Sequence, residues 1–200
     1  MLVKDLIETQ QDIEAGILKV STPKEAVRFL TAALGDPEGD QGLASRVWFW
    51  GDKAIKVTTK RDPCYTKFIK AVMEEGKGNP HFPRVFLYRE LKDNYPLVVM
   101  EKIRVNMNPP KEDVTVTFRG ERRKVKASIF ELMLLKKDII VSPDDLERLR
   151  SKYPDFDDTE RLLRKIKTWC RIDVHELNHG VRDDGTPVVI DPLRSHGLMQ

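Results

Sequence analysis

The sequence predicts an α+β protein in two parts, a small antiparallel sheet with helices followed by a reduced and mostly helical region. Two β-rich runs flank Gly51-Asp52 between residues 46 and 59, which is typical of a β-hairpin. Helix-capping signals occur on both sides of this hairpin, at Thr22 and at Ser142. Between the two signals, Pro109-Pro110 interrupts the chain and indicates a boundary between the two parts.

The first part is expected to begin with two helices. Residues from about 2 to 18 carry a loose apolar stripe at helical spacing. Thr22, Pro23 and Glu25 form an N-cap, a first-turn proline and a capping-box glutamate, so a second helix should run to Gly35. In the hairpin that follows, Trp48 and Trp50 are two residues apart, which predicts one buried face. A short helix and two strands complete this part, at about residues 63–75, 84–88 and 97–103.

The second part is predicted to contain a hairpin and then helices. Strands at 114–118 and 122–126 alternate around Gly120. Helices are expected at 129–137, from the Ser142 cap to about Lys152, and from a Thr159 cap to about Cys170. The predicted organisation is therefore a helical segment (1–36), a sheet-containing lobe (37–103) and a second lobe (104–200), with a hinge near 101–108.

Composition narrows the class of protein. The chain has 200 residues, 40% of them hydrophobic and 34% charged, with a net charge of +3. No apolar run approaches the length of a membrane span, so we expect a cytoplasmic protein with no membrane partner. The nearly balanced charge makes nucleic acid an unexpected direct ligand. Cys64 and Cys170 have no metal-ligand spacing and are interpreted as buried thiols.

Two local clusters of basic residues stand out, at 119–126 and 161–171. The simplest interpretation is that both are solvated faces, of a hairpin and of a helix. The alternative for the first cluster, which lies in the region 104–158, is that it docks an acidic partner surface.

The densest set of chemistry-bearing residues lies in 171–192, RIDVHELNHGVRDDGTPVVIDP. Phosphoryl transfer requires a carboxylate that orients the attacking hydroxyl and hard oxygen ligands for Mg²⁺ beside the phosphates. Asp173 suits the first role, and Asn178 and Asp191 suit the second. A turn at 183–185 predicts a hairpin that folds Asn178 back against Asp191.

The pattern D-x-H-x-x-N, followed by a hairpin and I-D-P, resembles the catalytic and metal-binding loops of the protein-kinase-like superfamily. KAIKV (53–57) resembles the strand of the phosphate-binding lysine, and PLVVMEKI (96–103) resembles the strand that enters the interlobe hinge. The resemblance covers about residues 40–192. It implies a two-lobed fold with a small N-terminal sheet, and dependence on ATP and Mg²⁺.

The resemblance also assigns roles to individual residues. It implies that Lys56 binds phosphate and pairs with a glutamate, for which Glu75 is preferred to Glu74. Asp173 and His175 would belong to the catalytic loop, with His175 holding the loop by hydrogen bonds. The nucleotide would contact Gly42 and Ser45 at its phosphates, Met100 behind the adenine, and the backbone of Glu101 to Ile103. Asn178 and Asp191 would bind the metal ion.

KAIKV, YTKFIKAV, FPRVF, VVMEKI and IDVHELNHG are also similar to segments of the early serine/threonine protein kinases of podovirus-type coliphages. This similarity implies transfer to host proteins in the host cytoplasm, with the transcription machinery as a candidate target. The chain departs from kinases at Ile172 and Pro192, where they carry Arg and Phe. Nine residues follow Asp191, so the substrate platform should come from 104–158, from a partner chain or from a small ligand.

Two alternatives follow from these departures. One is a small-molecule kinase, which His175 and the missing peptide platform would suit. The other is a kinase-like module without catalysis that binds and inhibits a host protein, or a nucleic-acid complex through residues 119–126.

Overall fold

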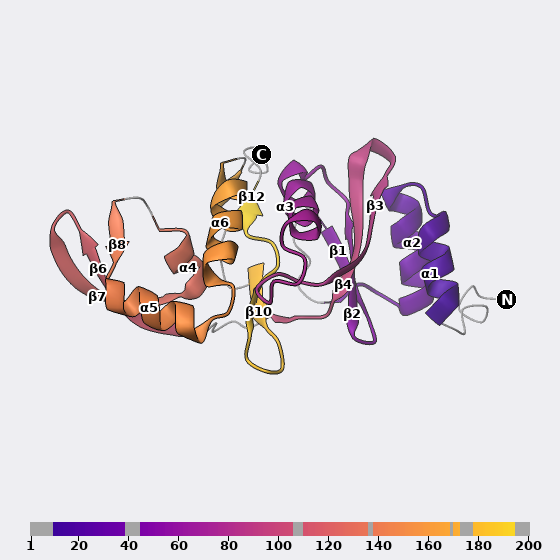
Figure 1. Cartoon of the computed structure of the whole chain (residues 1–200). Coiled ribbons are helices and arrows are strands. Elements are labelled where there is room, and N and C mark those ends of the chain that lie inside the picture. The colour runs from indigo at the N-terminus through magenta and orange to yellow at the C-terminus, as the bar shows by residue number, and fades with distance from the viewer. Residues whose placement is uncertain are drawn as a thin grey trace. The chain divides into compact units, whose positions relative to one another are not determined.

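The computed structural model describes residues 10–38, 45–105, 110–135, 138–168, 170–172 and 178–194 (Figure 1). Helices and antiparallel strands are mixed along the chain, which confirms the predicted α+β class. The contacts divide the chain into two compact units, unit 1 (1–66 and 84–102) and unit 2 (67–83 and 103–200). None of the helices in the described ranges has the length and apolar character needed to cross a membrane.

Unit 1 is a four-stranded antiparallel sheet with helices. Its elements are α1 (Gln10–Lys19), α2 (Pro23–Leu34), β1 (Ser45–Trp50), β2 (Lys53–Thr58), the first turn of α3 (Pro63–Glu74), β3 (Val85–Leu91), the 3₁₀ turn η2 (Lys92–Asn94) and β4 (Tyr95–Glu101). The strand order is β1-β2-β4-β3. In Figure 1, α1 and α2 lie beside each other against this sheet.

The helix and hairpin signals of unit 1 are confirmed in detail. The hydroxyl of Thr22 accepts a hydrogen bond from the N–H of Glu25, and the carboxylate of Glu25 accepts one from the N–H of Thr22, both at 3.2 Å. This capping box satisfies backbone donors that the first turn of α2 leaves open. Gly51 and Asp52 form the two-residue loop between β1 and β2, and Gly51 has the positive φ of +59° that such a turn requires.

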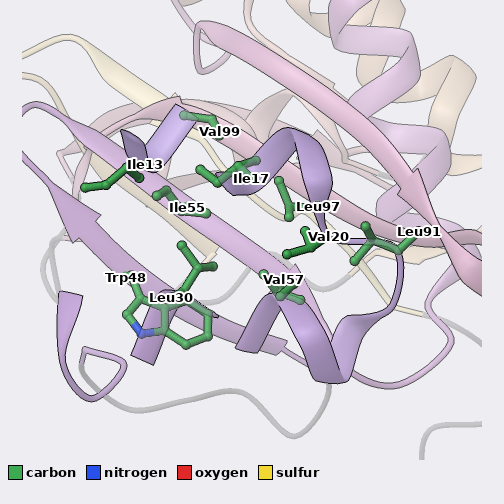
Figure 2. Packing of buried hydrophobic residues seen from close by; sticks show 11 residues of the cluster. Ile13, Ile17, Val20, Leu30, Trp48, Ile55, Val57, Leu91, Leu97 and Val99 are labelled. Atoms are coloured by element: carbon green, nitrogen blue, oxygen red, sulfur yellow. The ribbon is translucent and has the colours of Figure 1, made fainter. Parts of the chain in front are cut away.

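One hydrophobic core lies between α1, α2 and the sheet (Figure 2). Trp48 is 1% exposed in this core, and Trp50 packs against it from the same face of β1, as predicted. Figure 2 shows the side chains of α1 and α2 directed toward those of the strands. The buried members are Ile13, Ile17, Val20, Ala26, Leu30, Trp48, Ile55, Val57, Leu91, Leu97 and Val99.

Unit 2 contains the rest of α3 and a larger set of short elements. They are β5 (Arg104–Val105), β6 (Lys111–Phe118), β7 (Glu121–Ser128), α4 (Ile129–Met133), β8 (Ile139–Val141), α5 (Pro143–Lys152), α6 (Phe156–Lys167), β9 (Arg171–Ile172), β10 (His179–Val181), β11 (Pro187–Val189) and β12 (Leu193–Arg194). The strands form sheets of order β7-β6-β8, β11-β10-β5 and β12-β9. The prediction of a mostly helical second lobe was therefore wrong, and the strands that sequence did not predict, β5, β8, β9 and β12, have only two or three residues and carry no periodic signal.

Two helices of unit 2 test the capping signals. α5 begins after Ser142, whose hydroxyl accepts from the N–H of Asp145, as predicted. α6 begins at Phe156, three residues before the predicted Thr159 cap. The hydroxyl of Thr159 instead donates to the carbonyl of Asp155 at 2.8 Å and accepts from the amide of Asn79 at 2.9 Å. The side chain of Thr159 therefore forms a tertiary hydrogen bond and does not cap the start of α6.

The division into units differs from the predicted domains. Segment 67–83 belongs to unit 2, where the N–H of Val189 donates to the carbonyl of His81 at 3.0 Å. The guanidinium of Arg182 also donates to the carbonyl of Phe82, at 3.0 Å. The predicted segment 1–36 is not a separate unit, since α1 and α2 build the core of unit 1. The crossing at 102/103 lies next to the predicted boundary at 103/104.

Candidate functional site

Lys56 lies in the middle of β2, between two residues of the unit 1 core. Because Ile55 and Val57 face α1 and α2, strand alternation directs Lys56 to the opposite face of the sheet. Lys56 is only 9% exposed there, and its Nζ lies 3.6 Å from the ring centroid of Tyr65 in α3. A buried ammonium group is costly to desolvate, and an aromatic ring offsets part of that cost. A buried lysine in a strand interior is therefore a candidate functional group.

Two other predicted residues share the face of Lys56. Met100 pairs with Ala54, two residues before Lys56, and Ser45 pairs with Thr58, two residues after it. Directly opposed residues of antiparallel strands point to the same face, so all five lie on one side of the sheet. The hydroxyl of Thr58 is buried and has no hydrogen-bond partner among the described residues. Sequence reasoning missed Thr58, although its position two residues after Lys56 was an available signal.

Backbone groups of the predicted hinge are already hydrogen-bonded within unit 1. The N–H of Glu101 donates to the carbonyl of Arg84 at 2.9 Å, and the Glu101 carboxylate accepts from the N–H of Arg84 at the same distance. The N–H of Lys102 donates to the carbonyl of Asp52 at 2.8 Å. Ile103, the last predicted hinge contact, is buried in unit 2. Two of the backbone donors expected to meet a base therefore already have partners within unit 1.

Glu75 forms two ion pairs within unit 2. It directly follows α3, and its carboxylate lies 2.5 Å from Nζ of Lys165 and 3.8 Å from the guanidinium of Arg161. Both cations belong to α6, and each contacts a different carboxylate oxygen. These ion pairs anchor the end of α3 within unit 2, and the pairing of Glu75 with Lys56 stays a prediction.

The hairpin that carries Asn178 and Asp191 forms as predicted. β10 pairs with β11 in antiparallel register, with His179 opposite Val189. At the open end of the hairpin, the carbonyl of Asn178 accepts from the N–H groups of Ile190 and Asp191, at 2.8 and 3.1 Å. The two proposed metal ligands are therefore neighbours in space although they are thirteen residues apart in sequence.

Close packing holds this hairpin in place within unit 2. Gly180 lies opposite Val105 of β5, and a Cβ atom added to it would approach the carbonyl oxygen of Arg104 to 2.3 Å. Only glycine therefore permits this approach of β10 to β5.

The buried ring of His81 fixes the beginning of β11. Its Nδ1 lies 2.9 Å from the carbonyl oxygen of Pro187, and its Nε2 lies 2.9 Å from that of Pro154. Burial lowers the pKa of His81, so the ring is neutral near pH 7 and donates its single N–H to one of the two carbonyls. His81 therefore connects the hairpin to the loop before α6 and has a structural role.

Three predicted residues lie outside the described part of the chain. These are Asp173 and His175 of the catalytic pattern and Gly42 of the predicted phosphate-contacting segment. Their roles stay predictions. The described half of the pattern in unit 2 is therefore the pair formed by Asn178 and Asp191.

Asn178 and Asp191 supply an amide oxygen and a carboxylate, the hard donors that Mg²⁺ prefers. Magnesium typically keeps several waters and takes only one or two protein carboxylates, so this small donor set fits such an ion. Within the described ranges, no group of three or more His, Cys, Asp or Glu side chains could hold a metal. Cys64 and Cys170 are both disulfide-bonded, so the prediction of buried thiols was wrong.

A pocket of about 210 Å³ lies elsewhere in unit 2. Apolar side chains of α4, β8, α5 and α6 line it, together with the ion pair of Glu160 and Arg164. Typical small-molecule sites have volumes of roughly 300–1,000 Å³ and convergent polar groups. This pocket is smaller and mostly apolar, and none of the predicted site residues lines it. We do not assign it to the nucleotide.

Comparison with models of known protein families gave no match to this chain, and no curated protein matches it. The candidate site is therefore interpreted from its own residues.

Proposed function

We propose that this chain transfers a phosphoryl group from ATP, with Mg²⁺, to a serine or threonine hydroxyl of a protein. The observation that carries the proposal is the register of β10 and β11, which brings Asn178 next to Asp191. Because the backbones of these two residues are hydrogen-bonded, their amide and carboxylate groups would suit two ligands of one magnesium ion. The buried Lys56 of unit 1 supports the same function, because a fixed ammonium group suits a phosphate.

Each residue has a defined part in the proposed reaction. Asn178 and Asp191 would hold the metal ion, which when bound would neutralise charge on the phosphates. Lys56 would contact a phosphate oxygen, with Ser45 and Gly42 beside the phosphates and Met100 beside the base. Asp173 would orient the acceptor hydroxyl and take its proton, while His175 would position the loop.

Nucleotide binding is the first test of this proposal. Calorimetric titration with ATP is done in excess Mg²⁺ and again in chelator. We expect Lys56→Met to weaken binding about tenfold or more, because the phosphates lose a positively charged contact. Lys53→Met is the matched control, since Lys53 lies three residues earlier on β2 and is ion-paired with Glu14 at 3.2 Å. Equal ATP affinity in the two lysine variants would remove Lys56 from the site.

The metal ligands are tested in the same titration. The parent chain should bind ATP more tightly in Mg²⁺ than in chelator. Asp191→Asn should remove most of this difference in ATP affinity, because it removes the only carboxylate of the described pair. Asp183→Asn, in the exposed turn of the same hairpin, should retain that difference. A parent chain that binds ATP equally in both buffers contradicts the magnesium assignment, and one that binds no ATP contradicts the whole function.

Transfer is then measured with γ-labelled ATP and separate acceptors, namely the chain itself, a protein mixture and a set of small metabolites. We expect label on protein, and Asp173→Ala should reduce the rate by about 10²-fold or more while ATP affinity stays the same. Label on metabolites alone would show the small-molecule kinase instead. ATP binding without transfer to any acceptor would support a binding module.

A further inference from the structure

Strand β7 is an edge of the β7-β6-β8 sheet, and within the described residues it pairs only with β6. The pairing runs without a bulge from Lys111 opposite Ser128 to Phe118 opposite Glu121. β7 contains neither proline nor glycine. It therefore presents a regular row of backbone donors and acceptors to a further strand, and of the features that usually protect such an edge its sequence has only charged side chains.

The other edge strand of this sheet, β8, is much shorter, with only three residues. β8 pairs with β6 from Val116 to Phe118, and α5 completes the edge where β8 ends. There the N–H of Ser142 donates to the carbonyl of Thr115 at 2.8 Å, and the N–H of Thr115 donates to the carboxylate of Asp145 at 2.8 Å. The two edges therefore differ, since only β7 leaves a whole eight-residue strand available.

Four exposed basic residues lie on β7, namely Arg122, Arg123, Lys124 and Lys126. Arg123 pairs with Glu121 at 2.5 Å. The remaining three have no carboxylate within ion-pair distance among the described residues, although Asp113 stands opposite Lys126. This is a strong concentration of unneutralised charge on one strand.

Several basic side chains elsewhere in unit 2 form ion pairs with carboxylates of the same unit. Arg148 and Lys152 contact Glu112 at 2.9 and 2.6 Å, and Arg164 contacts Glu160 at 2.8 Å. The basic side chains of α5 and α6 thus hold the fold together through ion pairs. Of the β7 cations only Arg123 takes part in such a contact, so no described residue forms an ion pair with Arg122, Lys124 or Lys126.

The register places these cations on a particular face. Glu112, Val114 and Val116 are buried on the face of β6 toward α5. Arg122 and Lys124 lie opposite Thr117 and Thr115, on the other face. Because alternate residues of a strand are about 7 Å apart, Arg122, Lys124 and Lys126 form an evenly spaced positive row.

The chemistry of this face favours a peptide over a nucleic acid. The open face of the three strands carries Thr115, Thr117 and the exposed Ile140. None of the described residues on this face is aromatic. Single-stranded nucleic acids usually require aromatic side chains on which their bases stack. An extended peptide instead uses the backbone groups of an open edge, with side chains adding specificity.

A second copy of this chain does not fit the same edge. Pairing two β7 strands edge to edge would place like charges across from one another, which is destabilising. A partner strand with carboxylates at alternate positions would instead place each carboxylate near Arg122, Lys124 or Lys126.

We propose that the β7 edge binds an extended acidic segment of a partner protein, which adds to the β7-β6-β8 sheet as a fourth strand. Backbone hydrogen bonds to β7 hold the segment, and its alternate Asp or Glu side chains neutralise the positive row. The inference does not depend on the proposed phosphotransfer, because binding requires neither ATP nor Mg²⁺.

The test uses a fluorescent ten-residue peptide of alternating Glu and Thr and measures anisotropy with the full chain. The variant carries Arg122→Gln, Lys124→Gln and Lys126→Gln. The control carries Lys19→Gln, Lys24→Gln and Arg28→Gln, which remove the same net charge from α1 and α2. We expect the β7 variant to bind at least tenfold more weakly than the parent, and the control to bind within about twofold of it, because only the former loses cross-strand ion pairs. Equal weakening by both variants overturns the proposal.

Strand addition is tested separately with the unmodified chain, so the result does not depend on how the variants fold. Two versions of the peptide carry N-methyl groups on alternate residues, in opposite phase. Because an antiparallel or parallel partner donates only alternate N–H groups to one neighbour, one version should lose binding and the other should keep it. Equal binding by the two versions overturns the fourth-strand arrangement. A single-stranded oligonucleotide of equal charge that binds as tightly as the peptide would overturn the choice of a peptide partner.

Discussion

The sheet of unit 1 and the β7-β6-β8 sheet of unit 2 are both antiparallel, yet they bury their residues differently. In unit 1 every position from 54 to 58 in β2 and from 96 to 100 in β4 is buried, so both faces of the central strands are covered. In β6, buried Glu112, Val114 and Val116 alternate with more accessible residues, so only one face is covered. A charged residue is therefore buried on the central strands of the first sheet but can be solvated on the open face of the second.

On a strand covered on both faces, a lysine such as Lys56 is the exception that needs a chemical reason. On the half-covered sheet, charged residues are expected on the open side, and their presence alone indicates only solvation. What distinguishes Arg122, Lys124 and Lys126 is that the described residues leave them without the ion pairs that other cations of unit 2 make.

The largest expected effect comes from matched isoleucines in the two sheets. Ile55 of β2 is fully buried and Ile140 of β8 is 63% exposed. Ile55→Ala should lower the free energy of unfolding by about 2–5 kcal/mol, because it removes buried methyl groups and leaves a cavity. Ile140→Ala should change it by no more than about 0.5 kcal/mol. Urea unfolding followed by circular dichroism measures both, and a similar loss in the two variants would show that the open face is covered.

The second effect extends the comparison to the β11-β10-β5 sheet, where packing is tightest at Gly180. Gly180→Ala should destabilise the protein by about 1–3 kcal/mol, because the new Cβ must displace the backbone of β5. Asp184→Ala, in the turn of the same hairpin, is the control. If the proposed metal pair is correct, Gly180→Ala should also reduce the Mg²⁺-dependent part of ATP binding. Unchanged stability in this variant would mean that β10 and β5 do not approach as closely as described.

A third comparison uses two glutamates on the same hairpin. Glu112 of β6 is buried and accepts hydrogen bonds from Arg148 and Lys152 of α5 and from Tyr153, whereas Glu121 of β7 is exposed. Glu112→Gln should lower the free energy of unfolding by about 1–2 kcal/mol, since charge-assisted hydrogen bonds are lost but the two cations remain partly solvated. Glu121→Gln should have almost no effect. Equal melting temperatures of the two variants would contradict a clamp between β6 and α5.

The smallest expected effect is a loss of folding stability at acid pH. Hydrogen bonds from the Ser142 hydroxyl and the Thr115 N–H lower the pKa of Asp145 from 3.8 to about 2. Burial acts to raise the pKa of Glu112, but hydrogen bonds from Lys152, Tyr153 and Arg148 outweigh it and lower this pKa as well. Both groups bind protons more readily when unfolded, so their contribution is complete above about pH 4.5 and is lost as the pH falls toward 2.

This acid dependence can be assigned to Asp145 with one variant. Asp145→Asn should reduce the loss of stability between pH 4 and pH 2 relative to the parent chain, as measured by the urea midpoint. An unchanged pH profile in the variant would mean that the contacts of Asp145 with β6 and Ser142 do not persist in solution.

The local elements and one spatial relation of the candidate site were predictable from sequence. The N-terminal boundary of α2 and the β1–β2 turn depend on contacts within four residues, such as Thr22 with Glu25. The β10–β11 hairpin was predictable for the same reason, and with it the approach of Asn178 to Asp191. The place of Thr58 on the face of Lys56 was predictable from strand alternation, but the burial of its hydroxyl was not, because burial depends on distant segments.

Long-range contacts account for what local patterns did not predict. Thr159 resembled a helix cap, but it bonds to Asn79, which lies eighty residues away. Glu75, the predicted partner of Lys56, forms ion pairs with two cations of α6, about ninety residues further on. Neither partner could be chosen from local spacing, because several side chains of the right chemistry were available.

The sequence by itself thus determined which segments become helices and hairpins, and which side chains share a strand face, because those features depend on neighbours a few residues apart. Only the tertiary structure decided that 67–83 belongs to unit 2, that Glu75 pairs with α6, and that Arg122, Lys124 and Lys126 of β7 form no ion pair with a described residue. These features depend on which distant segments pack together. That choice is made by burial of apolar surface and by pairing of charges over the whole chain, to which each local pattern contributes only a small part.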